Sequence, residues 1–143
     1  MDTLKQNDGF TLIEIMVVII ILGLLASLIV PKLIGRTEEA KRTQVKLQIR
    51  NVEQALKLFK LDNGFYPETE QGLHSLVIIP EIGRIPKNYR KEGYLDKVPK
   101  DPWKNDYVYL SPGEHGDYDI LSYGADGIPG GEDEDADISS WGE

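Results

Sequence analysis

Residues Phe10 to Val30 read FTLIEIMVVIIILGLLASLIV, an apolar run of 21 residues in which Glu14 is the one charged residue. At about 1.5 Å per residue, a helix of this length spans roughly 30 Å, the thickness of the hydrocarbon core of a bilayer. The run is longer than the apolar part of an ordinary signal peptide, and a carboxylate lies near its start. It predicts a membrane helix, and taken alone it favours a plain single-pass anchor.

A second helical pattern follows Pro31. Because proline removes a helix hydrogen bond, we expect the helix to bend or fray there and to resume through about Leu61. Apolar residues then recur at spacings of 4, 3, 4 and 3, which is one stripe of an amphipathic helix: Val45, Ile49, Val52, Leu56 and Phe59. Asp62-Asn63-Gly64 predicts the end of this helix in a left-handed cap.

The second half of the chain predicts a small sheet. Residues 106–110 and 117–123 alternate in a strand-like way around the turn-rich segment 111–116, which indicates an antiparallel hairpin. Residues 70–76 are compatible with a short second helix. The expected fold class is α+β: a long N-terminal helix, half membrane segment and half amphipathic, packed on a small antiparallel sheet.

Composition excludes several classes of function. The chain has 143 residues, no cysteine and two histidines, so disulfides, thiol nucleophiles and thiolate metal sites are impossible. The net charge of −8 argues against a nucleic acid partner. Charge is also uneven: residues 10–60 hold eight basic and four acidic side chains, and residues 61–143 hold seven basic and 18 acidic ones.

The acidic residues gather near the C-terminus, with six in the twelve positions 126–137. A run of this kind is most often a solvated tail. Here glycines at 124, 127, 130 and 131 permit a tight loop, and Ile138 and Trp141 follow as possible anchors. Carboxylates and carbonyls are ligands for hard cations, although the spacing excludes an EF-hand.

The segment Gly9-Phe10-Thr11-Leu12-Ile13-Glu14, followed by the apolar run, resembles the class III signal of type IV pilins and pseudopilins. The resemblance implies that a prepilin peptidase removes the leader, residues 1–9, and N-methylates Phe10. It also implies that residues 10–30 stay in the mature protein as a transmembrane and filament-core helix. The leader MDTLKQND departs from the usual pattern because its acidic residues outnumber its one lysine.

Glu14 is costly inside a bilayer, by about 2.5–3.5 kcal/mol at the centre and less near the interface. A residue kept at that cost usually has a partner. The candidate partner is the free amine that cleavage would create on Phe10 of a neighbouring subunit. The alternative is that the Glu14 carboxylate extends to the lipid headgroups.

Further segments resemble the major pseudopilin family of type II secretion systems: Leu61–Pro67, Glu70–Leu73, Asp101–Trp103 and Ser122–Gly127. The resemblance implies a pilin-like lollipop in which residues 31–143 form a periplasmic domain. It implies a structural subunit without enzymatic activity, anchored in the bacterial inner membrane by a single pass. Such subunits polymerise into a helical periplasmic pseudopilus that drives export of folded proteins across the outer membrane. The implied partners are other copies of the chain, minor pseudopilins, the prepilin peptidase and the inner-membrane assembly platform.

The same resemblance implies calcium as a cofactor in the C-terminal loop. Carried onto this sequence, the ligands are Asp126, Asp135 and Asp137, with the backbone carbonyls of Tyr123 and Ile128. Asp133 is an alternative to Asp135, since the length of this loop varies in the family.

Two other functions stay open at this point. A type IV major pilin for adhesion, motility or DNA uptake would share the N-terminal motif, but such pilins commonly close a C-terminal loop with a disulfide. A membrane-tethered periplasmic hydrolase would have to rest on carboxylates, because no G-x-S-x-G, H-E-x-x-H or Walker pattern occurs in the chain.

Overall fold

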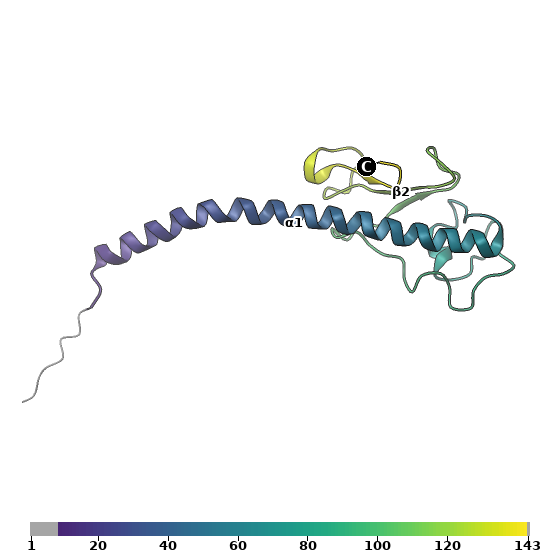
Figure 1. Ribbon diagram of the computed structural model, residues 1–143, viewed down its shortest axis with the longest axis horizontal. Helices are drawn as coiled ribbons and strands as arrows, with labels where there is room; N and C mark the ends of the chain where they lie inside the picture. The colour runs from purple at the N-terminus through teal and green to yellow at the C-terminus, as the bar shows by residue number, and fades with distance from the viewer. Residues whose placement is uncertain (1–8, 143) are drawn as a thin grey trace, which may run out of the picture. The chain divides into compact units, whose positions relative to one another are not determined.

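The computed structural model describes residues 9–142, and of residues 28–36 it describes the helical backbone alone. The chain divides into two compact units, Met1–Thr37 and Glu38–Glu143. Apart from Gly9, the predicted leader lies outside the described residues. The elements, in chain order, are helix α1 (Leu12–Asn63), the 3₁₀ helix η1 (Leu73–Leu76), strands β1 (Val108–Leu110) and β2 (Asp119–Ser122), the 3₁₀ helix η2 (Asp133–Asp135) and strand β3 (Ile138–Ser139) (Figure 1).

Helix α1 is longer than predicted and has no break at Pro31 in its helical backbone. The fraying that we expected at Pro31 is therefore not observed. The predicted end is confirmed: the helix stops at Asn63, and Gly64 follows with a φ of 84°. The Gly64 N–H donates to the Lys60 carbonyl oxygen at 2.7 Å, which closes the last turn.

The C-terminal part of α1 carries the core of the second unit. All five residues of the predicted stripe are buried, and none is more than 3% exposed. They pack against side chains from η1 and all three strands, including Leu76, Tyr109, Ile120 and Ile138. Burying one such side chain contributes about 1.5–3 kcal/mol. The stripe is thus what holds the sheet onto the helix, as the spacing predicts.

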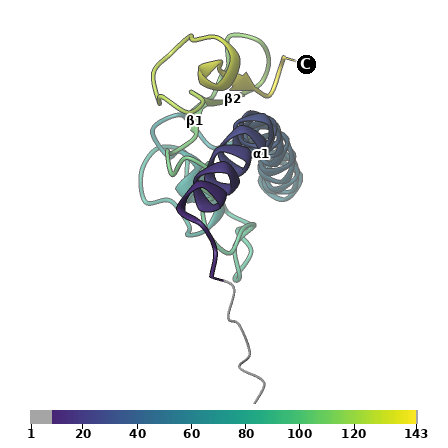
Figure 2. The same cartoon turned by 90° about the vertical axis from the view of Figure 1, so that its left-hand side faces the viewer.

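The three strands form one antiparallel sheet in the order β1-β2-β3. Tyr109 pairs with Ile120 in the predicted hairpin, and Ser122 pairs with Ile138 in the second pair. Both strands of the hairpin are shorter than the sequence indicated, and β3 was not predicted. Figures 1 and 2 show the strands along one side of the C-terminal part of α1. The α+β prediction is confirmed in these elements.

The large apolar side chains described between Phe10 and Leu25 in the first unit are exposed, from 81% at Leu12 down to 45% at Ile15. Within the residues that the structure describes, we find no helix that is both long and apolar enough to cross a membrane. The chain itself leaves these side chains uncovered, so other molecules must shield them from water.

Candidate functional site

The N-terminal motif lies at the start of α1. Phe10 is 79% exposed, and a Cβ atom placed on Gly9 would meet no atom within 4 Å. The fold therefore does not require glycine at position 9.

Thr11 and Glu14 cap the first turn of α1. The Thr11 hydroxyl accepts a hydrogen bond from the Glu14 N–H at 3.2 Å, and Glu14 Oε2 accepts one from the Thr11 N–H at 3.4 Å. This reciprocal arrangement is a capping box, which satisfies two N–H groups that the helix leaves without partners. This cap is neither of the two roles predicted for Glu14, although the pattern Thr-x-x-Glu before an apolar run could have predicted it.

The acidic residues near the C-terminus lie in the loop between β2 and β3, residues 123–137. Gly124 begins this loop with a φ of 70°, and a Cβ there would lie 2.7 Å from the Asp135 carbonyl oxygen. Backbone hydrogen bonds then close the loop on itself: the Ala125 N–H donates to the Glu134 carbonyl and the Asp137 N–H donates to the Gly130 carbonyl, both at 3.2 Å. The segment is a folded loop, as its glycines suggested, and not an extended tail.

The predicted calcium ligands all belong to this loop. Asp126 Oδ1 accepts a hydrogen bond from the Ile128 N–H at 3.0 Å, and Asp137 Oδ2 accepts one from the Gly130 N–H at 3.0 Å. Ile128 is 62% exposed, and Tyr123 is partly buried beside Gly124. In the described part of the chain, no three histidine or carboxylate side chains come close enough together to hold a metal ion.

One atom in the loop does suit a cation. Asp137 Oδ1 is buried, and it has no hydrogen-bond partner among the described residues. A buried carboxylate oxygen without a donor is energetically costly, and a hard cation is a suitable partner for it. The candidate metal-binding atoms of the loop are carboxylate and carbonyl oxygens, which are the ligands that calcium prefers.

Arg42 of α1 holds the loop against the helix. Its Nη1 donates to the carbonyl oxygens of Asp133 at 3.1 Å and Ala136 at 2.9 Å. Because the guanidinium binds carbonyls, the carboxylates of η2 stay free of it. Nothing in the sequence spacing signals this contact, so the role of Arg42 could not be predicted from the sequence.

A buried aspartate supports the other end of the loop. Asp101 is 3% exposed, and its Oδ1 accepts hydrogen bonds from the N–H groups of Trp103 and Asn105 at 3.0 and 2.8 Å. Its Oδ2 accepts the Ser122 hydroxyl at 2.8 Å. The Asn105 amide in turn donates to the Gly124 carbonyl at 3.3 Å. The Asp101–Trp103 segment is thus a structural brace for the point where the loop leaves β2.

The C-terminal end of the chain is fixed by an aromatic stack. The rings of His115 and Trp141 lie 4.0 Å apart and 7° from parallel. His115 Nδ1 lies 3.0 Å from Oδ2 of Asp119, which is 3% exposed. Burial raises the pKa of Asp119, but hydrogen bonds from the His115 ring and from the N–H groups of Glu114 and His115 outweigh it and hold this pKa below its usual value. Trp141 is thus an anchor, as the sequence suggested.

The motif and the domain each match a known family. Residues 4–30 match the prokaryotic N-terminal methylation motif, and residues 32–141 match the family described as type II secretion system, protein G. The chain belongs to the type II secretion system protein G family. It is 53% identical over 137 residues to the type II secretion system core protein G of Pseudomonas aeruginosa, covering 96% of both chains. It is 54% identical to the protein of that name in Escherichia coli strain K12, covering 96% of this chain and 92% of the relative.

A solved structure agrees with this assignment. The major pseudopilin from the type 2 secretion system of enterohaemorrhagic Escherichia coli is 44% identical, with a TM-score of 0.68 over 78% of this chain and 95% of that one. The recognition of a pseudopilin from the sequence is confirmed, and these findings favour it over the type IV major pilin. The roles of Gly9, Phe10, Glu14 and the calcium ligands remain predictions.

Proposed function

We propose that this chain is the major structural subunit of a type II secretion pseudopilus. The observation that carries the proposal is its membership of the protein G family, together with the methylation motif at its N-terminus. Copies of the chain polymerise into a helical periplasmic filament, and its growth drives export of folded proteins across the outer membrane. The role is structural, and we assign the chain no catalytic activity.

Processing precedes assembly in this proposal. A prepilin peptidase cuts after Gly9 and methylates the new amine of Phe10. Two observations support this order: Gly9 is not needed by the fold, and Phe10 is exposed ahead of the first helical turn. In this proposal, the glycine at position 9 serves recognition by the peptidase and not folding.

The apolar residues from Phe10 to Val30 anchor the subunit in the inner membrane by a single pass before assembly, and residues 31–143 then lie in the periplasm. In the filament, the same side chains pack against those of other copies. The exposure of the large apolar side chains described between Phe10 and Leu25 supports both states, since apolar surface of this extent needs lipid or protein to cover it. Glu14 pairs with the Phe10 amine of a neighbouring copy during assembly.

Calcium closes the C-terminal loop in this proposal. The carboxylates of Asp126, Asp135 and Asp137 would hold the ion, with the carbonyls of Tyr123 and Ile128. The unpartnered Asp137 Oδ1 and the glycine-dependent folding of the loop support this set. A bound ion would draw carboxylates of the loop into shared coordination, and its positive charge would offset their mutual repulsion. Such a cross-link suits a small exported domain that has no disulfide.

The remaining partners follow from the family's machinery: minor pseudopilins, the prepilin peptidase and the inner-membrane assembly platform. The test is complementation in a type II secretion strain that lacks its own protein G. We expect the full chain to restore export of a secreted enzyme and, when overproduced, to yield filaments that can be sheared from the cells. Accumulation of the processed chain without export or filaments would contradict the proposal.

A further inference from the structure

A groove of about 350 Å³ lies between α1 and the last residues of the chain, within the second unit. Helix α1 supplies one wall, and the end of β3 with the segment after it supplies the other. The lining residues are Lys46, Ile49, Arg50, Glu53, Ser139, Ser140 and Gly142.

The groove presents positive charge to solvent. Lys46 and Arg50 are both exposed, and they lie one turn apart on α1. Among the described residues, neither of them forms an ion pair. Glu53 also lines the groove; its Oε1 accepts a hydrogen bond from the Tyr118 hydroxyl at 3.3 Å, and it forms no ion pair with either cation in the described part of the chain. The two cations are therefore available to an anionic group from outside.

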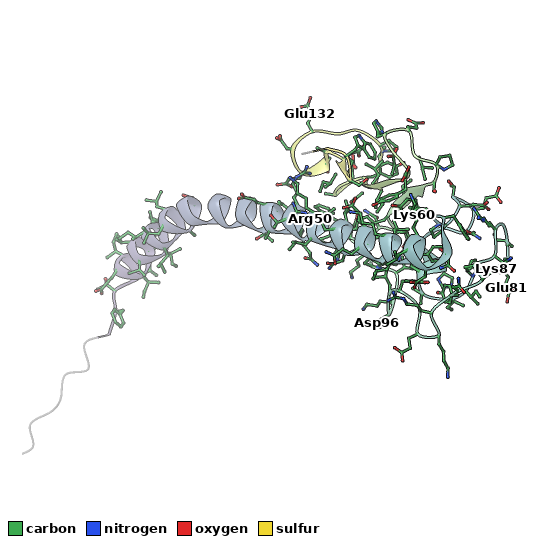
Figure 3. The ribbon with its side chains drawn as sticks, turned by 45° about the vertical axis from the view of Figure 1, so that its right-hand side comes forward. Arg50, Lys60, Glu81, Lys87, Asp96 and Glu132 are labelled. Carbon is green, nitrogen blue, oxygen red and sulfur yellow. The ribbon has the colours of Figure 1, made fainter. Side chains whose placement is uncertain are left out.

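The same chain exposes matching negative charge elsewhere. Glu132 and Glu134, at η2, are exposed and make no ion pair within the described residues. Arg42 binds this loop through carbonyl oxygens, so it leaves the glutamates unneutralised. Figure 3 shows Glu132 at the outer edge of the loop, with its side chain directed away from α1.

We propose that the groove at Lys46 and Arg50 binds Glu132 and Glu134 of a second copy of this chain. The proposal rests on the proposed function, since it describes a contact within the filament. The groove cations and the two glutamates are different residues of one chain, and no ion pair joins them within the described residues, so the contact is heterologous and can repeat from copy to copy without closing. Each exposed ion pair is weak and salt-sensitive, but a filament repeats it at every subunit.

Charge reversal tests the contact in the full chain, produced in the complementation strain. Lys46→Glu with Arg50→Glu places acidic side chains in the groove, opposite the glutamates of the neighbouring copy. Glu132→Lys with Glu134→Lys places basic side chains on the loop, opposite the cations of the groove. We expect each pair of changes to lower the yield of sheared filaments about tenfold or more, because like charges are brought together. The chain with all four changes should recover most of the yield. Lys87→Glu, which changes a lysine at the far end of the domain from Glu132 (Figure 3), serves as the control and should assemble normally.

Cysteine cross-linking tests the geometry separately, because the chain has no cysteine of its own. Arg50→Cys combined with Glu132→Cys should give a ladder of covalent oligomers when assembled filaments are oxidised. Lys87→Cys combined with Glu132→Cys should give none. A monomer without a ladder would mean that the groove is filled by the chain's own end or by nothing, and it would overturn the proposal.

The two levels of failure can be told apart. If the wild-type chain restores export and filaments while the reversed variants assemble as well as it does, the groove contact is wrong and the proposed function stands. If the wild-type chain forms no filaments, the proposed function itself fails. Steady-state amounts of each variant, together with its thermal midpoint in detergent, identify any that simply does not fold.

Discussion

Thr11 holds Glu14 at the first turn of α1, because each residue's side chain accepts a hydrogen bond from the other's backbone N–H. The carboxylate that we assign to pairing between subunits is therefore also a helix cap. These two roles predict different consequences for different substitutions, since a neutral amide can cap a helix but cannot pair as a charge with an amine.

Glu14→Gln should keep the cap and remove the charge, whereas Glu14→Leu should remove both. We expect both variants to insert into the membrane and both to lose filaments, because the Phe10 amine of the neighbour has no carboxylate to meet. The measurement is the yield of sheared filaments, with membrane-inserted precursor and processed chain quantified alongside. Normal assembly by Glu14→Gln, with loss only in Glu14→Leu, would assign Glu14 to the cap and refute the pairing.

Calcium should raise the thermal midpoint of the detergent-solubilised chain, and chelation should lower it. At ten times its dissociation constant, the ion would stabilise the fold by about 1.4 kcal/mol through mass action. Asp137→Asn and Asp126→Ala should each lower the midpoint in calcium and abolish the response to chelator. Asp96→Asn changes an exposed carboxylate outside the loop and serves as the control. If the thermal midpoint is the same with and without chelator, the acidic loop binds no calcium and this prediction is wrong.

Asp119 should make the fold sensitive to acid. Its pKa in the folded chain lies below the ordinary value of 3.8 because of the hydrogen bonds from His115 and Glu114. The carboxylate therefore stabilises the fold fully above about pH 4, and this contribution is lost as the pH falls through the lowered pKa. Asp119→Asn should lower the free energy of unfolding by about 1–3 kcal/mol at pH 7. Below pH 4, the free energy of unfolding should fall less steeply in this variant than in the wild-type chain. Unfolding free energy measured from pH 7 to pH 2 tests this, and equal acid sensitivity in both proteins would contradict it.

Phe59 should be one of the most sensitive core positions, because it is fully buried on the helix stripe. Phe59→Ala should destabilise the second unit by about 3–5 kcal/mol, through lost burial and the cavity that remains. Leu61→Ala, two positions along α1 and 77% exposed, should change stability by less than about 0.5 kcal/mol. Denaturant unfolding followed by tryptophan fluorescence compares the two. Similar losses would mean that the stripe does not hold the domain together.

Periodicity and turn chemistry predicted the parts of the fold that are local in sequence. The stripe from Val45 to Phe59 is buried because its spacing follows one face of a helix, and Gly64 ends that helix because it adopts positive φ without a steric penalty. Strand β3 was missed because two residues, Ile138 and Ser139, are too few to show alternation.

The contacts around the candidate site join residues far apart in the chain, and no spacing encodes them. Arg42 reaches Asp133, Asp101 braces Ser122, and His115 stacks on Trp141. The sequence could predict that the loop of residues 123–137 folds, from its glycines and its flanking anchors. It could not predict which side of α1 receives the loop, because that depends on tertiary packing.

The most direct test of the filament subunit is the intact mass of the chain in sheared pseudopili. The account predicts a subunit that begins at N-methylated Phe10, with residues 1–9 absent. Gly9→Val should leave the full-length precursor in the membrane and no subunit in filaments, even though a Cβ atom at this position meets no atom within 4 Å. Filaments built from a subunit that retains residues 1–9, or from Gly9→Val chains, would contradict the account.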